Sequence, residues 1–280
     1  MNYRHAYHAG SAADVFKHAL LVLQLAHLAQ KPSGFLALDT HAGAGLYDLR
    51  AAEAEKTGDW RHGIGRVLAE ASPHPALGGY LGLLRRWNPA PGAILRYPGS
   101  PLLLAACLRP QDRLIAAELQ PDEAASLTHW LATYPRARVL AADGYAVLKA
   151  SLPPPERRGL VLLDPPFETA DEPTRWVAAL RAAHRRFAIG SYFLWYPIKA
   201  RADADRLLAA VKASGIRRIY VAELLPFAEA RPFRLNGSGL VMVNPGHGLL
   251  ASLADLLPWL ARVLAREGAG GFRAEWLVRE

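Results

Sequence analysis

Four short apolar runs in this sequence each end in an acidic residue, and helical patterns separate them. The runs cover residues 35–39, 113–118, 137–143 and 159–164, and they end in Asp39, Glu118, Asp143 and Asp164. Apolar runs bounded by turn residues are typical of strands in a parallel sheet that is covered on both faces. The pattern therefore predicts an α/β fold with a doubly wound, mostly parallel sheet and helices on both faces.

Three later runs complete the expected sheet. Residues 187–195, 216–223 and 239–244 are strand candidates, which brings the predicted total to seven. No long helix separates the last two candidates, so we expect them to pair antiparallel. The predicted helices cover residues 12–30, 101–108, 121–134, 175–186 and 202–214.

One connection is too long for a simple crossover. More than seventy residues separate the first two predicted strands, whereas a strand-helix-strand unit needs about thirty. Ser100 followed by Pro101 is typical of a helix N-cap and first turn, so the crossover helix is expected to begin there. We therefore predict a main domain of residues 1–50 and 98–280, interrupted by a helical subdomain at 51–97.

The composition bears on whether the chain has disulfides, a metal site or a membrane span. A single cysteine, Cys107, excludes internal disulfides and a cysteine-based zinc site. His5 and His8 have no carboxylate or thiol cluster beside them in the sequence, so we expect no metal. The longest apolar run, 19–29, is shorter than the roughly 20 residues of a membrane span, and no secretory signal is evident. We expect a cytoplasmic protein that has no membrane partner and acts as a monomer.

Positive charge is concentrated in one part of the chain. The sequence has 33 Lys and Arg against 25 Asp and Glu, and only six of the basic residues are Lys. Segment 173–235 holds twelve basic and four acidic residues, which accounts for the whole net charge of +8. Arginine suits phosphate recognition, so this segment is a candidate nucleic-acid footprint whose binding would weaken with salt. The alternative is that these arginines only cover solvent-exposed faces.

The acidic strand ends and a glycine-rich turn form a candidate nucleotide site. The sequence Asp-Thr-His-Ala-Gly-Ala-Gly at 39–45 follows the first strand, and such a turn lets the backbone approach a ligand. Glu118 can accept hydrogen bonds from ribose hydroxyls, and Asp143 with Gly144 can meet an adenine ring. Each feature alone also fits a turn or a helix cap, but three successive acidic strand ends favour a bound nucleoside.

The sequence Asp164-Pro165-Pro166-Phe167 carries the most specific chemistry. Two prolines donate no hydrogen bond and hold the backbone extended, so carbonyl groups lie beside the Asp164 carboxylate. Such a pocket only accepts hydrogen bonds and suits an exocyclic amino group on a planar ring, on which Phe167 can stack. Asp164 is therefore the candidate catalytic residue, with Pro165 and Phe167 as candidate substrate-binding residues.

Taken together, these motifs resemble those of the RlmJ family, which belongs to the S-adenosylmethionine-dependent amino-methyltransferases. The resemblance rests on segments along the whole chain: Tyr-Arg-His-Ala-Tyr-His-Ala-Gly at 3–10, Asp-Val-Phe-Lys-His at 14–18, Leu-Asp-Thr-His-Ala-Gly-Ala-Gly at 38–45, Tyr-Pro-Gly-Ser-Pro at 97–101, Asp-Pro-Pro-Phe at 164–167 and Trp-Tyr-Pro at 195–197. The resemblance implies methylation of N6 of one adenine, nucleotide 2030 in the family, in 23S ribosomal RNA. The resemblance implies a Rossmann-like class I methyltransferase fold, S-adenosyl-L-methionine as cofactor and 23S ribosomal RNA as partner.

The resemblance also implies roles for individual residues. The implied cofactor-binding positions are His18, His41, Ser100, Glu118, Asp143, Gly144 and Asp164. Asp164 matches the catalytic residue, Tyr3 matches the residue expected near the substrate base, and Lys17 is a candidate substrate contact. One position departs from the family pattern, because Phe167 stands where Tyr is expected. Stacking survives this change, whereas a hydrogen bond from a tyrosine hydroxyl does not.

Two alternatives stay open. A guanine-N2 ribosomal RNA methyltransferase has a similar Asp-Pro-Pro-Phe sequence, and an RNA-binding assembly factor could keep the fold without turnover. Glu118, Asp164 and the glycine-rich turn together argue against the assembly factor, because a pure binding protein needs no such combination.

Overall fold

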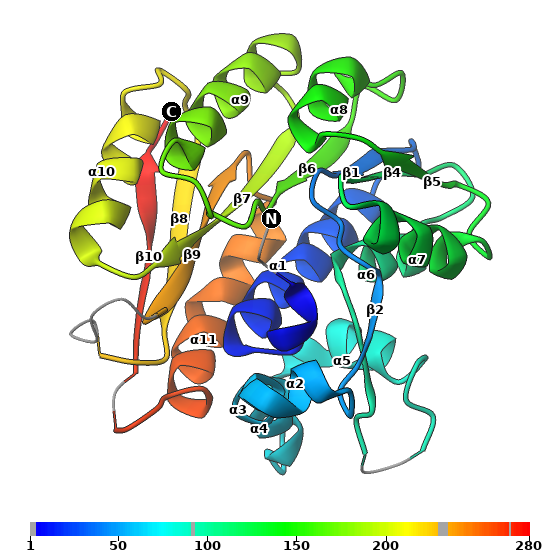
Figure 1. Ribbon diagram of the computed structural model, residues 1–280. Coiled ribbons are helices and arrows are strands. Elements are labelled where there is room, and N and C mark those ends of the chain that lie inside the picture. The colour runs from blue at the N-terminus through cyan, green and yellow to red at the C-terminus, as the bar shows by residue number, and fades with distance from the viewer. Residues whose placement is uncertain (1–3, 91–92, 229–234, 269) are drawn as a thin grey trace.

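A mostly parallel sheet forms the centre of the computed structural model, which describes residues 4–90, 93–228, 235–268 and 270–280. Its strands are β1 (Leu36–Asp39), β4 (Arg113–Glu118), β5 (Ala137–Ala141), β6 (Gly159–Leu163), β7 (Ser191–Ile198), β8 (Ile219–Leu225), β9 (Gly237–Val243) and β10 (Gly271–Val278). Their order across the sheet is β10-β8-β9-β7-β6-β1-β4-β5, and helices pack on both faces (Figure 1). The predicted α/β class and its Rossmann-like arrangement are confirmed.

The direction of each strand follows from its connections. Strands β5, β4, β1, β6 and β7 are parallel neighbours joined by helical crossovers. Strand β9 lies antiparallel between β7 and β8, so the predicted antiparallel pair is confirmed. All residues of β6 are buried, as expected for a central strand with helices on both faces.

The prediction of seven strands is wrong by one, because the described part of the main sheet has eight. The additional strand, β10, pairs antiparallel with β8 at the edge of the sheet. Its residues are mostly half-buried, and Arg273 and Glu275 interrupt its apolar pattern. An edge strand has only one neighbour and so lacks the continuous apolar run that marks the buried strands.

The helices that flank the sheet are α1 (Ala12–Ala29), α6 (Ser100–Ala106), α7 (Pro121–Leu131), α8 (Gly144–Ser151), α9 (Glu172–Arg186), α10 (Arg201–Lys212) and α11 (His247–Val263). Helices α8 and α11 are additional to the predicted ones. The expectation that Ser100 caps α6 is wrong, because Gly99 is the N-cap and Ser100 is the first helical residue. The Ser100 hydroxyl instead donates a hydrogen bond to Asp39 Oδ2 at 2.7 Å.

Two apolar layers hold the helices to the sheet. On one face, α1, α6 and α11 contribute side chains such as Phe16, Leu103 and Leu256. On the other face, α9 and α10 contribute Trp176 and Leu207, with α8 beside them. The carboxyl ends of the parallel strands stay uncovered by either layer, which leaves room for a site at that edge.

Helix α1 is central to the first layer. The whole helix is 18 residues long and has a mean hydropathy of 1.2, so by length and composition it could cross a membrane. The apolar run at 19–29 alone is too short to show this. However, 61% of this helix is buried inside the fold, and it packs against α11 and α6. These contacts are those of a core helix, and they bring its first turn to the edge of the sheet.

A small two-stranded sheet flanks the segment predicted as an insertion. Strands β2 (Leu46–Asp48) and β3 (Arg96–Pro98) pair antiparallel and enclose the short helices α2 (Ala52–Thr57), α3 (Asp59–His62), α4 (Ile64–Ala69), η2 (Pro75–Leu77) and α5 (Gly78–Leu84). Ile64 and Tyr80 of these helices belong to the same apolar cluster as Phe16 of α1. The division of the chain into two domains stays a prediction.

Two isoleucines test this account of the core. Ile219 in β8 is 0% exposed between β9 and β10, whereas Ile189 in the turn before β7 is 73% exposed. Ile219→Ala should lower the free energy of unfolding by about 2–5 kcal/mol because it leaves a cavity, and Ile189→Ala by less than about 0.5 kcal/mol. Urea unfolding measures both variants, and equal losses would contradict the packing described.

Candidate active site

A cavity of about 880 Å³ opens at the edge of the sheet where the parallel strands end. Strand β1 pairs in register with β4 and β6, so that Asp39 lies opposite Ala116 and Leu162. Glu118 and Asp164 each lie two residues further along the chain, and both line the cavity. The parallel register thus brings acidic side chains from separate strands to one edge.

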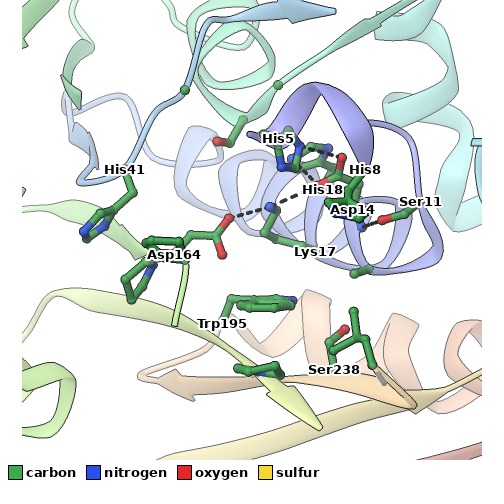
Figure 2. Close-up of a pocket in the computed structure, with 18 of the residues that line it drawn as sticks. His5, His8, Ser11, Asp14, Lys17, His18, His41, Asp164, Trp195 and Ser238 are labelled. Atoms are coloured by element: carbon green, nitrogen blue, oxygen red, sulfur yellow. Dashed lines mark hydrogen bonds and ion pairs between the residues drawn. The ribbon is translucent and has the colours of Figure 1, made fainter. Parts of the chain in front are cut away.

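Lys17 of α1 forms an ion pair with Asp164 within this cavity (Figure 2). The Lys17 Nζ atom is 2.5 Å from Asp164 Oδ2 and 3.1 Å from Asp14 Oδ1. Both partners are well shielded from solvent, since the side chains of Lys17 and Asp164 are 5% and 15% exposed. A cation therefore occupies one oxygen of the carboxylate that the sequence predicts to accept an amino group.

Asp14 connects the first turn of α1 to the N-terminal segment. Its Oδ2 atom accepts a hydrogen bond from the backbone N–H of Gly10 at 3.0 Å and lies 2.9 Å from His5 Nε2. Burial alone would raise the pKa of Asp14, but the neighbouring charges of His5 and Lys17 lower this pKa well below its usual value. Asp14 is therefore an anion that holds both η1 (His5–Tyr7) and the Lys17 ammonium in place.

His18, one turn after Asp14, is completely buried and lines the cavity. Its Nδ1 atom lies 2.8 Å from the Tyr97 hydroxyl, which in turn lies 2.8 Å from the hydroxyl of Tyr80. Burial lowers the pKa of His18 from 6.5 to about 3, so the ring is neutral near pH 7. In the described part of the chain, Nε2 of His18 has no hydrogen-bond partner. A buried polar atom of this kind fits a bound molecule that completes its hydrogen bonding.

The glycine-rich turn after β1 is fastened to Glu118. Oε2 of Glu118 accepts a hydrogen bond from the N–H of Gly43 at 2.8 Å, and Oε1 accepts one from Gln120 at 2.8 Å. Gly43 and Gly45 have φ values of 65° and 91°, a conformation that favours glycine. The Glu118 carboxylate is thereby held rigidly at the cavity wall.

Asp143 is both a helix cap and a cavity residue. Its Oδ1 atom accepts a hydrogen bond from the N–H of Ala146 at 2.9 Å, and the side chain lines the cavity. A Cβ atom on the next residue, Gly144, would lie 1.9 Å from the carbonyl oxygen of Thr40, so only glycine fits there. The turns after β1 and β5 therefore approach each other closely at this end of the cavity.

His41 and the Ser100–Asp39 pair complete this side of the site. His41 Nδ1 lies 2.8 Å from the Thr40 hydroxyl, and burial lowers the pKa of His41 to about 4. Asp39 is fully buried behind Ser100, and burial raises its pKa to about 7. His41 and Ser100 line the cavity, whereas Asp39 supports Ser100 from behind.

The aromatic residues near Asp164 are arranged differently from the sequence expectation. Phe167 has a left-handed backbone with φ of 51° and packs edge-on against Trp195, with ring centroids 6.1 Å apart. Trp195 and Pro165 line the cavity, whereas Phe167 packs against the apolar layer beside α8 and α9. Stacking of Phe167 on a base stays a prediction, and Tyr3 lies outside the described residues.

The basic segment 173–235 is divided between the two edges of the sheet. Four of its described arginines form ion pairs: Arg175 with Asp143 and Glu172, Arg201 with Glu223, Arg206 with Asp203 and Arg218 with Glu280. Helices α9 and α10 end at the edge opposite the cavity, and the basic residues there are Arg185, Arg186, Lys212 and Arg217. Arg175 and Lys199 line the cavity, and Arg231 and Arg234 fall outside the described residues. The single footprint expected from composition is therefore not what the described residues form.

Sequence reasoning missed two parts of the site. Asp14 is one turn from Lys17 and His18, and this spacing on a helix was the available signal that the three share a face. Tyr80 comes from the inserted segment and gave no such signal, and Tyr97 was recognised only as part of the motif at 97–101 and not as a partner of His18. Over the residues that the structure covers, no group of three or more His, Cys, Asp or Glu could hold a metal ion.

Asp39→Asn should remove a pH dependence of stability. The raised pKa of Asp39, about 7 against an ordinary 3.8, means that the fold keeps a proton that the unfolded chain releases in this range. The stability contributed by this proton is fully present below about pH 4 and is lost as the pH rises to about 7. Wild-type protein should therefore lose about 1 kcal/mol per pH unit relative to Asp39→Asn across this range.

Urea unfolding of both proteins at several pH values measures this difference. The exposed Asp122→Asn variant on α7 is the control and should follow the wild type at every pH. A constant difference between wild type and Asp39→Asn would mean that Asp39 is ionised throughout.

Known proteins resemble this chain along its whole length. A family model described as "Ribosomal RNA large subunit methyltransferase D, RlmJ" matches residues 32–278. The chain is 39% identical to "Ribosomal RNA large subunit methyltransferase J" of Escherichia coli and 38% identical to the Haemophilus influenzae protein of the same name. Both alignments extend over 280 residues and cover 100% of each chain.

A solved structure shares the fold. The crystal structure of protein LPL1258 from Legionella pneumophila matches with a TM-score of 0.89 at 30% identity, over 96% of this chain and 98% of that chain. The resemblance read from the motifs is confirmed, and the chain belongs to the RlmJ family of large-subunit ribosomal RNA methyltransferases.

Proposed function

We propose that the protein transfers a methyl group from S-adenosyl-L-methionine to N6 of one adenine in 23S ribosomal RNA and produces N6-methyladenosine. Family membership supports an enzyme that methylates large-subunit ribosomal RNA in the cytoplasm. The observation that carries the choice of an amino group is the acceptor site at Asp164, which two prolines without N–H groups follow. The proposed target within the RNA is the adenine that the family resemblance implies.

The residues of the cavity fit the family's cofactor, S-adenosyl-L-methionine. His18 offers a buried ring nitrogen that has no hydrogen-bond partner in the described structure, and Glu118 offers a carboxylate fixed by two backbone hydrogen bonds. When bound, the cofactor supplies an electrophilic methyl group. We assign its binding to these residues together with His41, Ser100, Asp143, Gly144 and Asp164.

Asp164 and Pro165 are the proposed partners of the adenine amino group. The Asp164 carboxylate accepts an amino N–H, and the Pro165 carbonyl is the second proposed acceptor, so that the nitrogen lone pair is oriented by the protein. Asp164 need not be a strong base, because the amino group becomes acidic only as its new bond forms. The protein therefore contributes mainly orientation and a place for the released proton.

The ion pair between Lys17 and Asp164 affects how the substrate can bind. Because its ammonium contacts Asp164 Oδ2, an amino group that binds there has to displace it or share that oxygen. Asp14 offers the ammonium a second partner at 3.1 Å, so Lys17 can move away from Asp164 without losing all its charge compensation. We further assign a substrate contact to Tyr3, ahead of η1. The predicted contact of Phe167 with the base requires its ring to leave Trp195 and turn into the cavity.

Asp164→Asn tests the proposed acceptor. Methyl transfer from labelled S-adenosyl-L-methionine to unmodified 23S RNA should fall by more than about 100-fold, because the amide can no longer accept the proton. The affinity for the cofactor should change by less than about tenfold. The exposed Asp255→Asn variant on α11 is the matched control and should keep wild-type activity. Full activity of Asp164→Asn would overturn the assignment.

Nucleoside analysis of the methylated RNA identifies the product. N6-methyladenosine supports the proposal, whereas N2-methylguanosine would show that the enzyme is a guanine methyltransferase. No transfer despite cofactor and RNA binding would favour an assembly factor.

Glu118→Gln tests the cofactor assignment separately. The amide keeps one acceptor oxygen but loses the charge and presents an N–H group to a backbone donor, so cofactor affinity should fall about 10- to 100-fold. Calorimetric titration with S-adenosylhomocysteine measures the affinity without turnover. An unchanged affinity would remove Glu118 from the cofactor site.

A further inference from the structure

The cavity continues past Asp164 on the side away from the glycine-rich turn. Because β6 lies between β1 and β7 in the sheet, Asp164 separates the side that contains Glu118 and His41 from a second side at the ends of β7, β8 and β9. Figure 2 shows Trp195 and Ser238 across Asp164 from His41. We call this second side the β7–β9 lobe, which is lined by Trp195, Pro197, Lys199, Pro226, Ser238 and Arg266.

The charge of the β7–β9 lobe is positive. Lys199 and Arg266 have no ion-pair partner within the part of the chain that the structure describes. The nearby Arg201 differs, because it is held by the buried carboxylate of Glu223 at 2.9 Å. Two cations without carboxylate partners at the wall of a cavity are suited to anionic groups such as phosphates.

The backbones of both cationic residues are anchored. The side-chain amide of Asn236 donates a hydrogen bond to the carbonyl oxygen of Lys199 at 2.9 Å, and the N–H of Arg266 donates one to Pro226 at 2.7 Å. The Arg266 guanidinium lies over the ring of Phe227, 5.1 Å from its centroid. The lobe therefore presents its two cationic side chains from anchored backbone positions.

The aromatic ring of Trp195 lies in the cavity wall between Asp164 and these two cations. Its ring lines the cavity, meets Phe167 edge-on and carries an indole N–H that has no acceptor among the described residues. Aromatic surfaces of this kind stack on nucleobases irrespective of sequence. The order along the lobe, from acceptor through aromatic wall to cations, matches the order of amino group, base and phosphate in a nucleotide.

We propose that the target nucleotide enters through the β7–β9 lobe and that Lys199 and Arg266 bind the phosphates flanking it. The proposal rests on the proposed function and adds the path of the RNA strand to it. The target base has to leave its helix or lie in a single strand to reach Asp164, and its sugar-phosphate backbone then follows the lobe outward.

The double variant Lys199→Gln/Arg266→Gln tests this path. The probe is the unmodified 23S RNA transcript, and its dissociation constant is measured by filter binding over a range of salt concentrations. The slope of log affinity against log salt should become less steep by about 1.4, since each lost contact with a single strand contributes about 0.7. The dissociation constant should rise by about tenfold at moderate salt.

The matched control is the double variant Lys212→Gln/Arg217→Gln. Both residues are exposed and carry the same charges, but Lys212 is the last residue of α10 and Arg217 follows it, so both lie at the end of α10 opposite to Lys199. This variant should keep the wild-type slope. Titration with S-adenosylhomocysteine should give wild-type affinity for both double variants, which shows that they are folded.

The outcomes separate the two proposals. An unchanged slope for Lys199→Gln/Arg266→Gln, in an enzyme that methylates 23S RNA, would overturn the path and leave the function standing. An equal loss in both double variants would also overturn it, because the effect would then be one of net charge. A wild-type protein that binds this RNA with the expected slope difference but transfers no methyl group would support the path and contradict the proposed function.

Discussion

The in-register parallel pairing of β1 with β4 and β6 is the constraint on which the site depends. Asp39 pairs with Ala116 on one side and Leu162 on the other. A shift of either strand by one residue would turn its side chains to the other face of the sheet and break the alignment of Glu118 and Asp164 at the edge. The buried apolar residues of β6 hold this register, so the core and the site are set by the same pairing.

The N-terminal helix adds the second half of the site. Helix α1 is buried against the sheet by its apolar face, and its first two turns carry Asp14, Lys17 and His18 to the cavity. Asp14 binds the ammonium of Lys17, and this ammonium also contacts Asp164, the residue that directly follows β6. One ion-pair chain therefore connects the N-terminal segment to the proposed catalytic carboxylate, although they are far apart in sequence.

Parts of this arrangement could be predicted from the sequence. The strand-end positions of Glu118 and Asp164 follow from apolar runs that stop at an acid, because parallel strands end at one edge. His18 could be named only through the family resemblance, since one histidine on a helix has no chemical pattern. Asp14 could have been predicted as a site residue, because helical spacing places it on the same face as Lys17 and His18.

Other features depend on contacts that no local pattern records. The pairing of Arg201 with Glu223 joins residues from neighbouring elements, and it removes a charge that composition alone assigned to RNA binding. Strand β10 was missed because its half-buried edge position needs no apolar run. The left-handed backbone of Phe167 turns its ring toward Trp195, so the residue that lines the cavity is the tryptophan.

A crystal structure with S-adenosylhomocysteine and adenosine monophosphate tests the central claim most directly. The account predicts the cofactor product between His18, Glu118 and Asp143, and the adenine amino group at Asp164 with the Lys17 ammonium moved toward Asp14. It also predicts the phosphate in the β7–β9 lobe. Adenosine monophosphate bound away from Asp164, with the contact of Lys17 and Asp164 intact, would contradict it.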